Sequence, residues 1–230
     1  MLSIVIPIYY EEGNVKKLIS GIERNVKTKK EILMIYDFNE DPTVNVIKAL
    51  NKKAVCLVKN FTGNKRGVVN AIKSGFKKAK GEAVLVVMAD LADDLRIVDK
   101  MFKKIKEGDD IVCGSRYMTG GKKIGGPFLK TFLSKLAGKS LYHLASIPTQ
   151  DSTNAFKMYK KSVIRSIPIE TDGGFEFSME LTIKAFKKGY KISELPSVWK
   201  NRTSGKSNFK MLKWFPRYLK VYLSAFSKQA

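Results

Sequence analysis

The sequence predicts an α/β protein built on a mostly parallel sheet with helices on both faces. Short runs rich in β-branched residues alternate with longer segments in which apolar residues recur at helical spacing. The short runs are continuously apolar, which is typical of strands buried on both faces of a parallel sheet. Gly81 and Gly108 follow lysine-rich helical segments, as glycines at helix C-termini often do.

The predicted elements alternate through the first half of the chain. Strands are expected at residues 4–8, 32–35, 54–58, 83–87 and 111–113. Helices are expected between them, at residues 12–26, 42–51, 65–79 and 94–106. Beyond Gly114 the glycine-rich sequence MTGGKKIGGP predicts a loop, and amphipathic helices are expected at 128–144 and within 209–226.

Composition limits the class of protein. With 230 residues, of which 44% are hydrophobic, the chain can bury a full core as one large domain or as a domain with an appendage. The two cysteines, Cys56 and Cys113, lie in apolar runs and are expected to be buried thiols of a reduced compartment. The single histidine, His143, argues against a zinc site. With neither a basic leader nor an apolar run of about 18 residues, the chain is expected to be soluble or bound at a membrane surface.

The charge is large and unevenly distributed. The formal net charge is +22; residues 116–150 carry six lysines and arginines and no acid, and residues 184–230 carry twelve and one acid, Glu194. Such polarity favours an anionic partner, namely nucleic acid, anionic lipid headgroups or a phosphorylated substrate. Nucleic acid is disfavoured, because the sequence has no recognised binding motif and the acids described next would repel its phosphates.

A predicted strand runs directly into three acids. In VLVVMADLADDL the apolar run is followed by Asp90, Asp93 and Asp94. Ligands of open α/β sheets bind at the carboxyl ends of strands, so the cluster suggests a site for a divalent cation bound to phosphates. The alternative is an ordinary helix N-terminus, where acids are favoured, and Asp93 and Asp94 fit that alternative well. Asp90 is therefore the best candidate ligand.

Seven segments in order carry a family resemblance, from Ser3 to about Asn208. They are SIVIPIYYEEGNV, EILMIYDFNEDPT, GVVNAIKSGFKKAKGEAVLVVMADLADD, DIVCGSRY, DSTNAFKMY, GGFEFSMELTIKAFKKGYKISELP and RTSGKSN. The chain resembles family 2 glycosyltransferases of the GT-A fold, especially the dolichyl-phosphate mannose synthase and polyprenyl-phosphate glycosyltransferase group. The resemblance implies a catalytic domain over 1–207, with a nucleotide-binding half (about 1–115) and an acceptor half (about 116–207), followed by a basic amphipathic segment, 208–230.

The resemblance implies a site for a nucleotide-diphosphate sugar at the carboxyl ends of the strands. The residues expected to bind this donor are Pro7, Tyr9, Glu11, Asp37, Arg66, Asp90 and Lys206. Divalent Mg²⁺ or Mn²⁺ is expected on Asp90, with Asp93 and Asp94 as further candidate ligands. The chain departs from the family pattern at Tyr36, which replaces the first acid of VVDD, and at Met88, which replaces the first acid of DxD. Thioether sulfur is a poor ligand for hard cations, but Mg²⁺ often needs only one or two protein carboxylates beside substrate phosphates.

The resemblance implies inverting sugar transfer as the chemistry. The resemblance suggests that Arg116, Arg202 and Lys206 neutralise the departing diphosphate, and that Asp151 is the catalytic base or orients the acceptor. A hydroxyl acceptor needs such a base, whereas a phosphomonoester is a competent nucleophile at neutral pH. Glu176 and Glu180 are expected to pack beneath the site. For Arg66 and Lys206, plain surface exposure is an equally strong interpretation.

The basic, aromatic helices favour an anionic membrane surface, at its cytoplasmic face, and the resemblance implies a polyprenyl phosphate acceptor there. The two helices would otherwise dock on the core or on a second copy of the chain in a homo-oligomer. Other functions left open are a glycosyltransferase with a hydroxyl acceptor on a glycan, and a non-catalytic relative that binds nucleotide sugars. A nucleotidyltransferase is disfavoured, because IPIYYEE replaces the glycine-rich loop expected there.

Overall fold

A seven-stranded sheet forms the centre of the molecule in the computed structural model, which describes residues 1–61, 66–201 and 211–227. Its strands, in the order β3-β2-β1-β4-β7-β5-β8, are Val55–Lys59, Lys30–Tyr36, Leu2–Pro7, Ala83–Val86, Lys157–Lys160, Ile111–Ser115 and Ile192–Pro196. All neighbours pair in parallel except β7, which is antiparallel to both β4 and β5. A separate parallel pair consists of β6 (Lys122–Ile124) and β9 (Val198–Lys200).

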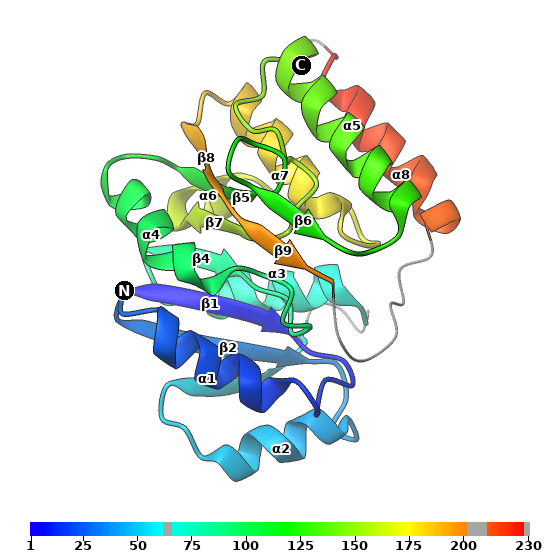
Figure 1. The fold of residues 1–230 in the computed structure, drawn as a ribbon. Coiled ribbons are helices and arrows are strands. Elements are labelled where there is room, and N and C mark those ends of the chain that lie inside the picture. The colour runs from blue at the N-terminus through cyan, green and yellow to red at the C-terminus, as the bar shows by residue number, and fades with distance from the viewer. Residues whose placement is uncertain (62–65, 202–210, 228–230) are drawn as a thin grey trace.

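Helices cover both faces of the sheet (Figure 1). In chain order they are α1 (Val15–Asn25), α2 (Pro42–Leu50), α3 (Val68–Lys78), α4 (Val98–Lys106), α5 (Phe128–Leu144), α6 (Lys161–Ser166), α7 (Glu176–Lys187) and α8 (Met211–Ser224), with a 3₁₀ turn at Leu95–Ile97. No helix in the described part of the chain is long and apolar enough to cross a bilayer.

The alternation of side chains along β1 explains the two-sided core. Ile4 and Ile6 point into a cluster with α1 and α4, whereas Val5 points into a second cluster with α3 and α7. Successive residues of a strand face opposite sides of a sheet, so a strand covered on both sides must be apolar throughout. Burial of each such side chain contributes roughly 1.5–3 kcal/mol.

The predicted α/β architecture is confirmed, and the five predicted strands and the predicted helices of the first half occur close to their expected positions. The loop prediction for MTGGKKIGGP is partly wrong, because Lys122–Ile124 pairs with Val198–Lys200 across a long sequence separation. Cys113 is buried as predicted, but Cys56 is exposed. Cys56 lies on β3, an edge strand of the sheet, and edge strands are covered less completely than central ones.

The second half of the molecule adds a third layer beside the sheet. Helices α5 and α8 lie next to each other at the upper right of Figure 1, and a small core of Leu141, Ile147, Met179, Ile183 and Val221 joins them to α7. Gly138 allows α5 to approach the chain before Asp151, because a Cβ at this position would collide with the carbonyl group of Gln150. The C-terminal helix is therefore packed against the domain that precedes it.

Candidate active site

The carboxyl ends of β2, β1 and β4 bring the predicted donor residues to one edge of the sheet. These three strands are adjacent and parallel, so Pro7 at the end of β1, Asp37 after β2 and Asp90 after β4 follow neighbouring strands. Ligands of open α/β sheets bind at this edge. Three of the residues that the sequence predicted to bind one donor, Pro7, Asp37 and Asp90, therefore lie at the same edge of the sheet.

Three aromatic side chains cluster where β1 and β2 end. The ring of Tyr9 lies 4.8 Å from that of Tyr10 and 5.9 Å from that of Phe38, between centroids, with edge-to-face geometry. Tyr9 is 51% exposed, and the guanidinium of Arg66 lies 5.3 Å from the centroid of the Phe38 ring. An exposed aromatic cluster beside a cation is suited to a planar, anionic ligand such as a nucleotide.

The N-terminus of α2 stabilises the turn that follows β1, which contains Tyr10 and Glu11. Tyr10 has a positive φ of 53°, and its N–H donates to Asp41 Oδ2 at 3.0 Å. The N–H of Glu11 donates to Thr43 Oγ1 at 2.8 Å, and its carboxylate accepts a bond from Asn14. Asp41 is fully buried and also accepts from the Thr43 N–H as the helix N-cap. The sequence EDPT predicts such a cap, because an aspartate precedes a proline at the start of the helix. The hydrogen bonds between the cap and the backbone of Tyr10 and Glu11 could not be predicted from the sequence.

Asp37 is held by two donors on the segment that leads to α3. Its Oδ1 accepts from Asn60 Nδ2 at 2.8 Å, and its Oδ2 accepts from the Gly67 N–H at 2.9 Å. Each carboxylate oxygen can accept a second hydrogen bond, so the group can still receive an N–H of a nucleobase.

The three acids after β4 have different surroundings. Asp90 and Asp93 line one large cavity, whereas Asp94 points to Arg96, whose Nε and Nη2 donate to its two oxygens at 2.8 and 2.9 Å. Burial opposes ionisation of Asp94, but the bonds from Arg96 hold its pKa below the usual value. Asp94 therefore caps the 3₁₀ turn at Leu95–Ile97, as the helix-terminus alternative predicted.

Asp93 carries an unfavourable charge. Burial, and after it the negative charge of Asp90, raises the pKa of Asp93 to about 7, although the N–H of Met88 donates to its Oδ2 at 3.1 Å. Two neighbouring carboxylates of this kind are a site that a cation would stabilise. Within the described residues, no three acidic, histidine or cysteine side chains converge to hold a metal ion by themselves.

We expect Asp93→Asn to raise the free energy of unfolding of the metal-free protein at pH 8, by up to about 4 kcal/mol. The pKa of Asp93 is raised on folding from 3.8 to about 7, so its contribution to stability is present below pH 4 and is lost as the pH rises through 7. Denaturation at pH 4 and pH 8 measures this, with the exposed Glu40→Gln as control. The gain in the free energy of unfolding should nearly vanish at pH 4. An equal gain at both pH values would contradict the raised pKa of Asp93.

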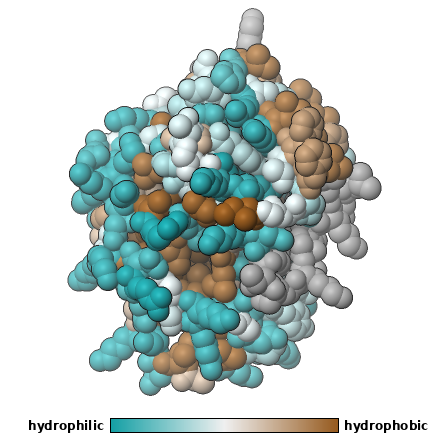
Figure 2. All heavy atoms as spheres, viewed as in Figure 1, coloured by the Kyte–Doolittle hydropathy of each residue, from teal (hydrophilic) through white to brown (hydrophobic). Residues whose placement is uncertain are grey.

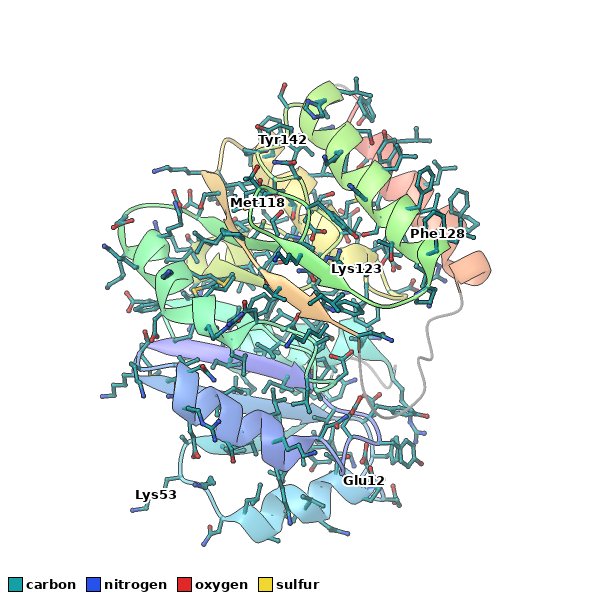
Figure 3. All side chains as sticks on the ribbon, viewed as in Figure 1. Glu12, Lys53, Met118, Lys123, Phe128 and Tyr142 are labelled. Carbon is teal, nitrogen blue, oxygen red and sulfur yellow. The ribbon has the colours of Figure 1, made fainter. Side chains whose placement is uncertain are left out.

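A cavity of about 790 Å³ extends from these acids to α5 and α8. Its polar end includes Asp90, Asp93, Arg116 and Lys123. Its other walls are mainly apolar and include Leu133, Leu136, Met179, Phe215 and Leu219. Figure 3 labels Lys123 on β6 and Phe128 at the start of α5, both in this half of the molecule. The cavity thus joins a charged end to an apolar end.

Arg116 is fixed at the polar end by Asp151. Its Nε and Nη2 donate to Asp151 Oδ2 and Oδ1, each at 2.7 Å, and its backbone N–H donates to Oδ2 at 2.9 Å. Asp151 is fully buried, whereas the Arg116 side chain is 10% exposed and lines the cavity. Burial alone would lower the pKa of Arg116, but Asp151 raises it above the usual value. Asp151 therefore orients Arg116.

Two further polar residues, which the sequence did not single out, complete this end. Ser134 on α5 accepts from Arg116 Nη2 at 3.2 Å and bonds Thr153 at 2.6 Å. Lys123 on β6 donates to Thr131 at 2.7 Å, and its Nζ lies 5.1 Å from the centroid of the Trp199 ring. Burial, and after it the charge of Arg116, lowers the pKa of Lys123 to about 8. Their sequence context, a glycine-rich stretch and an amphipathic helix, carried no specific signal.

Two further predicted residues, Glu176 and Glu180, do not line the cavity. Glu176 and Glu180 are buried on α7, where they accept bonds from Gly174 and from Glu170 and Thr171, respectively. Arg202 and Lys206 lie outside the residues that the structure describes.

Comparison with known proteins identifies the family. The family model described as Glycosyl transferase family 2 matches residues 3–167, well over half of the chain. The chain belongs to glycosyl transferase family 2. Among its relatives are the dolichol-phosphate mannosyltransferases of Pyrococcus furiosus, 31% identical over 91% of this chain and 59% of that protein, and of Saccharomyces cerevisiae, 26% identical over 89% and 79%. The chain thus spans a little over half of the Pyrococcus protein.

Solved structures of other glycosyltransferases have the same fold. Glucosyl-3-phosphoglycerate synthase from Mycobacterium tuberculosis, in complex with uridine diphosphate, matches 98% of this chain and 79% of its own with a TM-score of 0.75 at 16% identity. A complex of the same enzyme with Mn²⁺, uridine diphosphate and phosphoglyceric acid matches with a TM-score of 0.74, also at 16% identity, over 100% and 80% of the two chains. The family 2 chain therefore has the GT-A fold that the sequence predicted.

Proposed function

We propose that this family 2 chain transfers a sugar from a nucleotide-diphosphate sugar to a polyprenyl phosphate at a membrane surface, with inversion at the anomeric carbon. The cavity carries the proposal, because it joins Arg116, Lys123 and Lys130 to apolar walls of α5 and α8. A lipid phosphate has the complementary form, an anionic head and an apolar tail. The names of the Pyrococcus and yeast relatives, both dolichol-phosphate mannosyltransferases, support the same acceptor class.

The donor would occupy the strand ends of the first half. Its base and ribose would lie against the Tyr9 and Phe38 rings near Asp37, and its diphosphate would lie toward Asp90. Arg66, beside Phe38, is placed to approach an anionic part of the donor.

The transfer would be a single displacement. An oxygen of the acceptor phosphate forms the new bond to the anomeric carbon from the side opposite the leaving group, and the bond to the diphosphate oxygen breaks. The electron pair of that bond leaves with the nucleoside diphosphate, whose new negative charge needs stabilisation. Arg116 is held ready for that purpose by its two bonds to Asp151.

The locked Asp151 favours a phosphate acceptor over a hydroxyl acceptor. A hydroxyl must lose a proton as it attacks, so it requires a base within hydrogen-bond reach. Asp151 is fully buried and occupied by Arg116, which makes it unsuitable as that base. A phosphate monoester, with a second pKa of about 6, is already ionised at neutral pH and needs none.

Asp90 and Asp93 fit a divalent cation, because two carboxylates share a partly buried site in which one of them has a raised pKa. They would hold Mg²⁺ or Mn²⁺, with the donor phosphates completing the coordination. When bound, such an ion supplies positive charge to the departing diphosphate. Met88, where the family often has an acid, lines the same cavity and cannot replace that ligand.

The exposed apolar residues of α5 and α8 would dock on the bilayer, at its cytoplasmic face. Phe128 is 83% exposed and Leu144 71%, and Leu129, Phe132, Leu219 and Leu223 are also exposed. Figure 2 shows a hydrophobic patch at the upper right of the molecule, where Figure 1 has α5 and α8. With lysines among them and a net charge of +22, this surface suits anionic lipid headgroups.

A transfer assay tests the proposal. The protein is incubated with Mn²⁺, a panel of nucleotide sugars and a polyprenyl phosphate in anionic vesicles, and the glycolipid is measured. Matched acceptors are the same polyprenol without phosphate and a free disaccharide, and matched vesicles are zwitterionic. We expect product from the lipid phosphate alone, at a higher rate on anionic vesicles.

Other outcomes identify the alternatives. Product from the disaccharide would establish a hydroxyl acceptor, and donor binding without transfer to any acceptor would establish a non-catalytic relative. Absence of nucleotide binding, with or without Mn²⁺, would refute the proposal.

A further inference from the structure

Lys157 is a buried cation that the proposed transfer does not use. It lies on β7, fully buried, in a protein whose other lysines are mostly at the surface. Burial of an ammonium group is costly unless its hydrogens are bonded. Three hydrogen bonds compensate for this burial. Their acceptors lie in the loop after Asp151 and on α7, which packs against that loop.

The Lys157 ammonium holds the loop that follows Asp151. Its Nζ donates to the carbonyl groups of Ser152 at 2.7 Å and Asn154 at 2.6 Å, and to Ser178 Oγ at 2.6 Å. Ser178 in turn donates to the Asn154 carbonyl group at 2.5 Å. All three donors of the ammonium are thus used, and two of them bind backbone carbonyl groups within four residues of Asp151.

A carboxylate holds the other end of the same loop. Glu194 on β8 accepts from Thr149 Oγ1 at 3.0 Å and from the Gln150 N–H at 2.8 Å. The Glu194 carboxylate therefore accepts a backbone N–H of the loop before Asp151, and the Lys157 ammonium donates to backbone carbonyl groups of the loop after it. Between these two supports lie Asp151 and Thr153, both of which bond the Arg116 guanidinium.

We propose that Lys157 is a positioning residue for the transfer, which fixes the 152–154 backbone so that Asp151 and Thr153 hold the Arg116 guanidinium at the cavity. The expected effect of Lys157 on catalysis rests on the proposed function, but its effect on the position of Arg116 can be measured separately. Lys157 itself does not line the cavity, so it acts through Arg116. The charged groups near it are Arg116 and Asp151, and the titratable thiol of Cys113 lies beside them.

The ammonium is charged at neutral pH. Burial lowers the pKa of Lys157 to about 8, while Cys113 and Asp151 act in the opposite direction. A charged donor forms stronger bonds to carbonyl groups than a neutral one.

Lys157→Met tests the proposal, because methionine is also unbranched and has no donor. Lys160→Met is the matched control, on the same strand but with a half-exposed side chain paired to Asp110. We expect Lys157→Met to lower kcat at least about 30-fold while the donor KM changes less than about 2-fold, because the strand ends that bind the donor are untouched. Lys160→Met should change neither value by more than about 2-fold. A fall in activity shared equally by both variants would overturn the proposal.

The conservative variant separates charge from packing. If Lys157 only fills space, Lys157→Met should be at least as active as the bulkier Lys157→Arg. If it positions the loop by donating to carbonyl groups, Lys157→Arg should recover most of the lost kcat. Where Lys157→Met fails to fold, Ser178→Ala removes one of the three partners more gently and should lower kcat about 5-fold; an unchanged kcat in that variant would overturn the proposal.

A readout without catalysis keeps this proposal distinct from the proposed function. The Arg116 N–H donates to Asp151 Oδ2, so its hydrogen exchange reports whether the loop is in place. Lys157→Met should accelerate that exchange at least about 10-fold, with the amides of β1 unchanged, whether or not the protein transfers sugar. Unchanged exchange would overturn the positioning role even in an active enzyme, and absence of transfer by the unaltered protein would refute only the proposed function.

Discussion

Replacing Asp90 by asparagine is expected to reduce sugar transfer by about 10²–10³-fold, the usual cost of removing one preorganised electrostatic group from an active site. Asp90 follows β4 and lines the cavity together with Asp93, at the point where the donor diphosphate would lie. Asparagine keeps the size and one acceptor oxygen, so the turn in which the Ala92 N–H donates to Oδ1 can persist. The variant therefore loses only the negative charge. Its effect is measured as kcat/KM for transfer and, by calorimetry, as the Mn²⁺-dependent affinity for nucleotide.

Asp94→Asn is the matched control for this prediction. The change is chemically identical and only four residues away, but Asp94 caps the 3₁₀ turn and pairs with Arg96 instead of lining the cavity. Asparagine caps a helix as well as aspartate does, so the variant loses mainly the ion pair with the exposed Arg96; it should cost no more than about 1 kcal/mol in the free energy of unfolding and leave transfer nearly unchanged. If Asp94→Asn abolished Mn²⁺-dependent binding and Asp90→Asn did not, the assignment of the two acids would be reversed.

The fold was predictable because its strands carry a strong local signal. A strand such as Ile4–Val5–Ile6 must be apolar at every position when clusters on both faces bury it, and such runs stand out in a basic sequence. The antiparallel strand β7 and the short pair β6 and β9 did not stand out. Each of these strands forms by pairing with a strand far along the chain, as Lys123 on β6 pairs with Trp199 on β9. No local sequence pattern indicates such a pairing. The exposure of Cys56 was missed for a similar reason, since an edge position is a property of the assembled sheet.

The positions of the candidate site residues were predictable where these residues follow strands, and not where they come from elsewhere. Asp37 and Asp90 stand directly after apolar runs, so their meeting at one edge follows from parallel order. Ser134 and Lys157 are ordinary polar residues in sequence, and their roles appear only when α5 and α7 pack around the loop at Asp151. Their contacts depend on three-dimensional packing, which one sequence does not encode as a motif.

The Arg116–Asp151 pair yields the largest expected effect on stability. Arg116→Met should lower the free energy of unfolding by about 3–5 kcal/mol, because it leaves a carboxylate buried without its partner. Asp151 is fully buried, and the variant would remove both side-chain bonds from Arg116 while the bonds from the backbone N–H of residue 116 and from Thr153 Oγ1 remain. Chemical denaturation measures the change. The exposed pair of Arg217 and Asp172 is the control, since Arg217→Met should cost no more than about 1 kcal/mol.

The double variant distinguishes a functional pair from a structural one. Arg116→Met combined with Asp151→Leu removes both charges, and replacement of a buried ion pair by apolar groups is often neutral, so most of the lost stability should return. Transfer should not return, because the cavity would still lack the Arg116 guanidinium that we propose stabilises the departing diphosphate. Nucleotide binding by the double variant would confirm that the donor half is intact. Recovery of transfer together with stability would mean that Arg116 and Asp151 only support the fold, and that the charge of the leaving group is stabilised by other residues of the cavity.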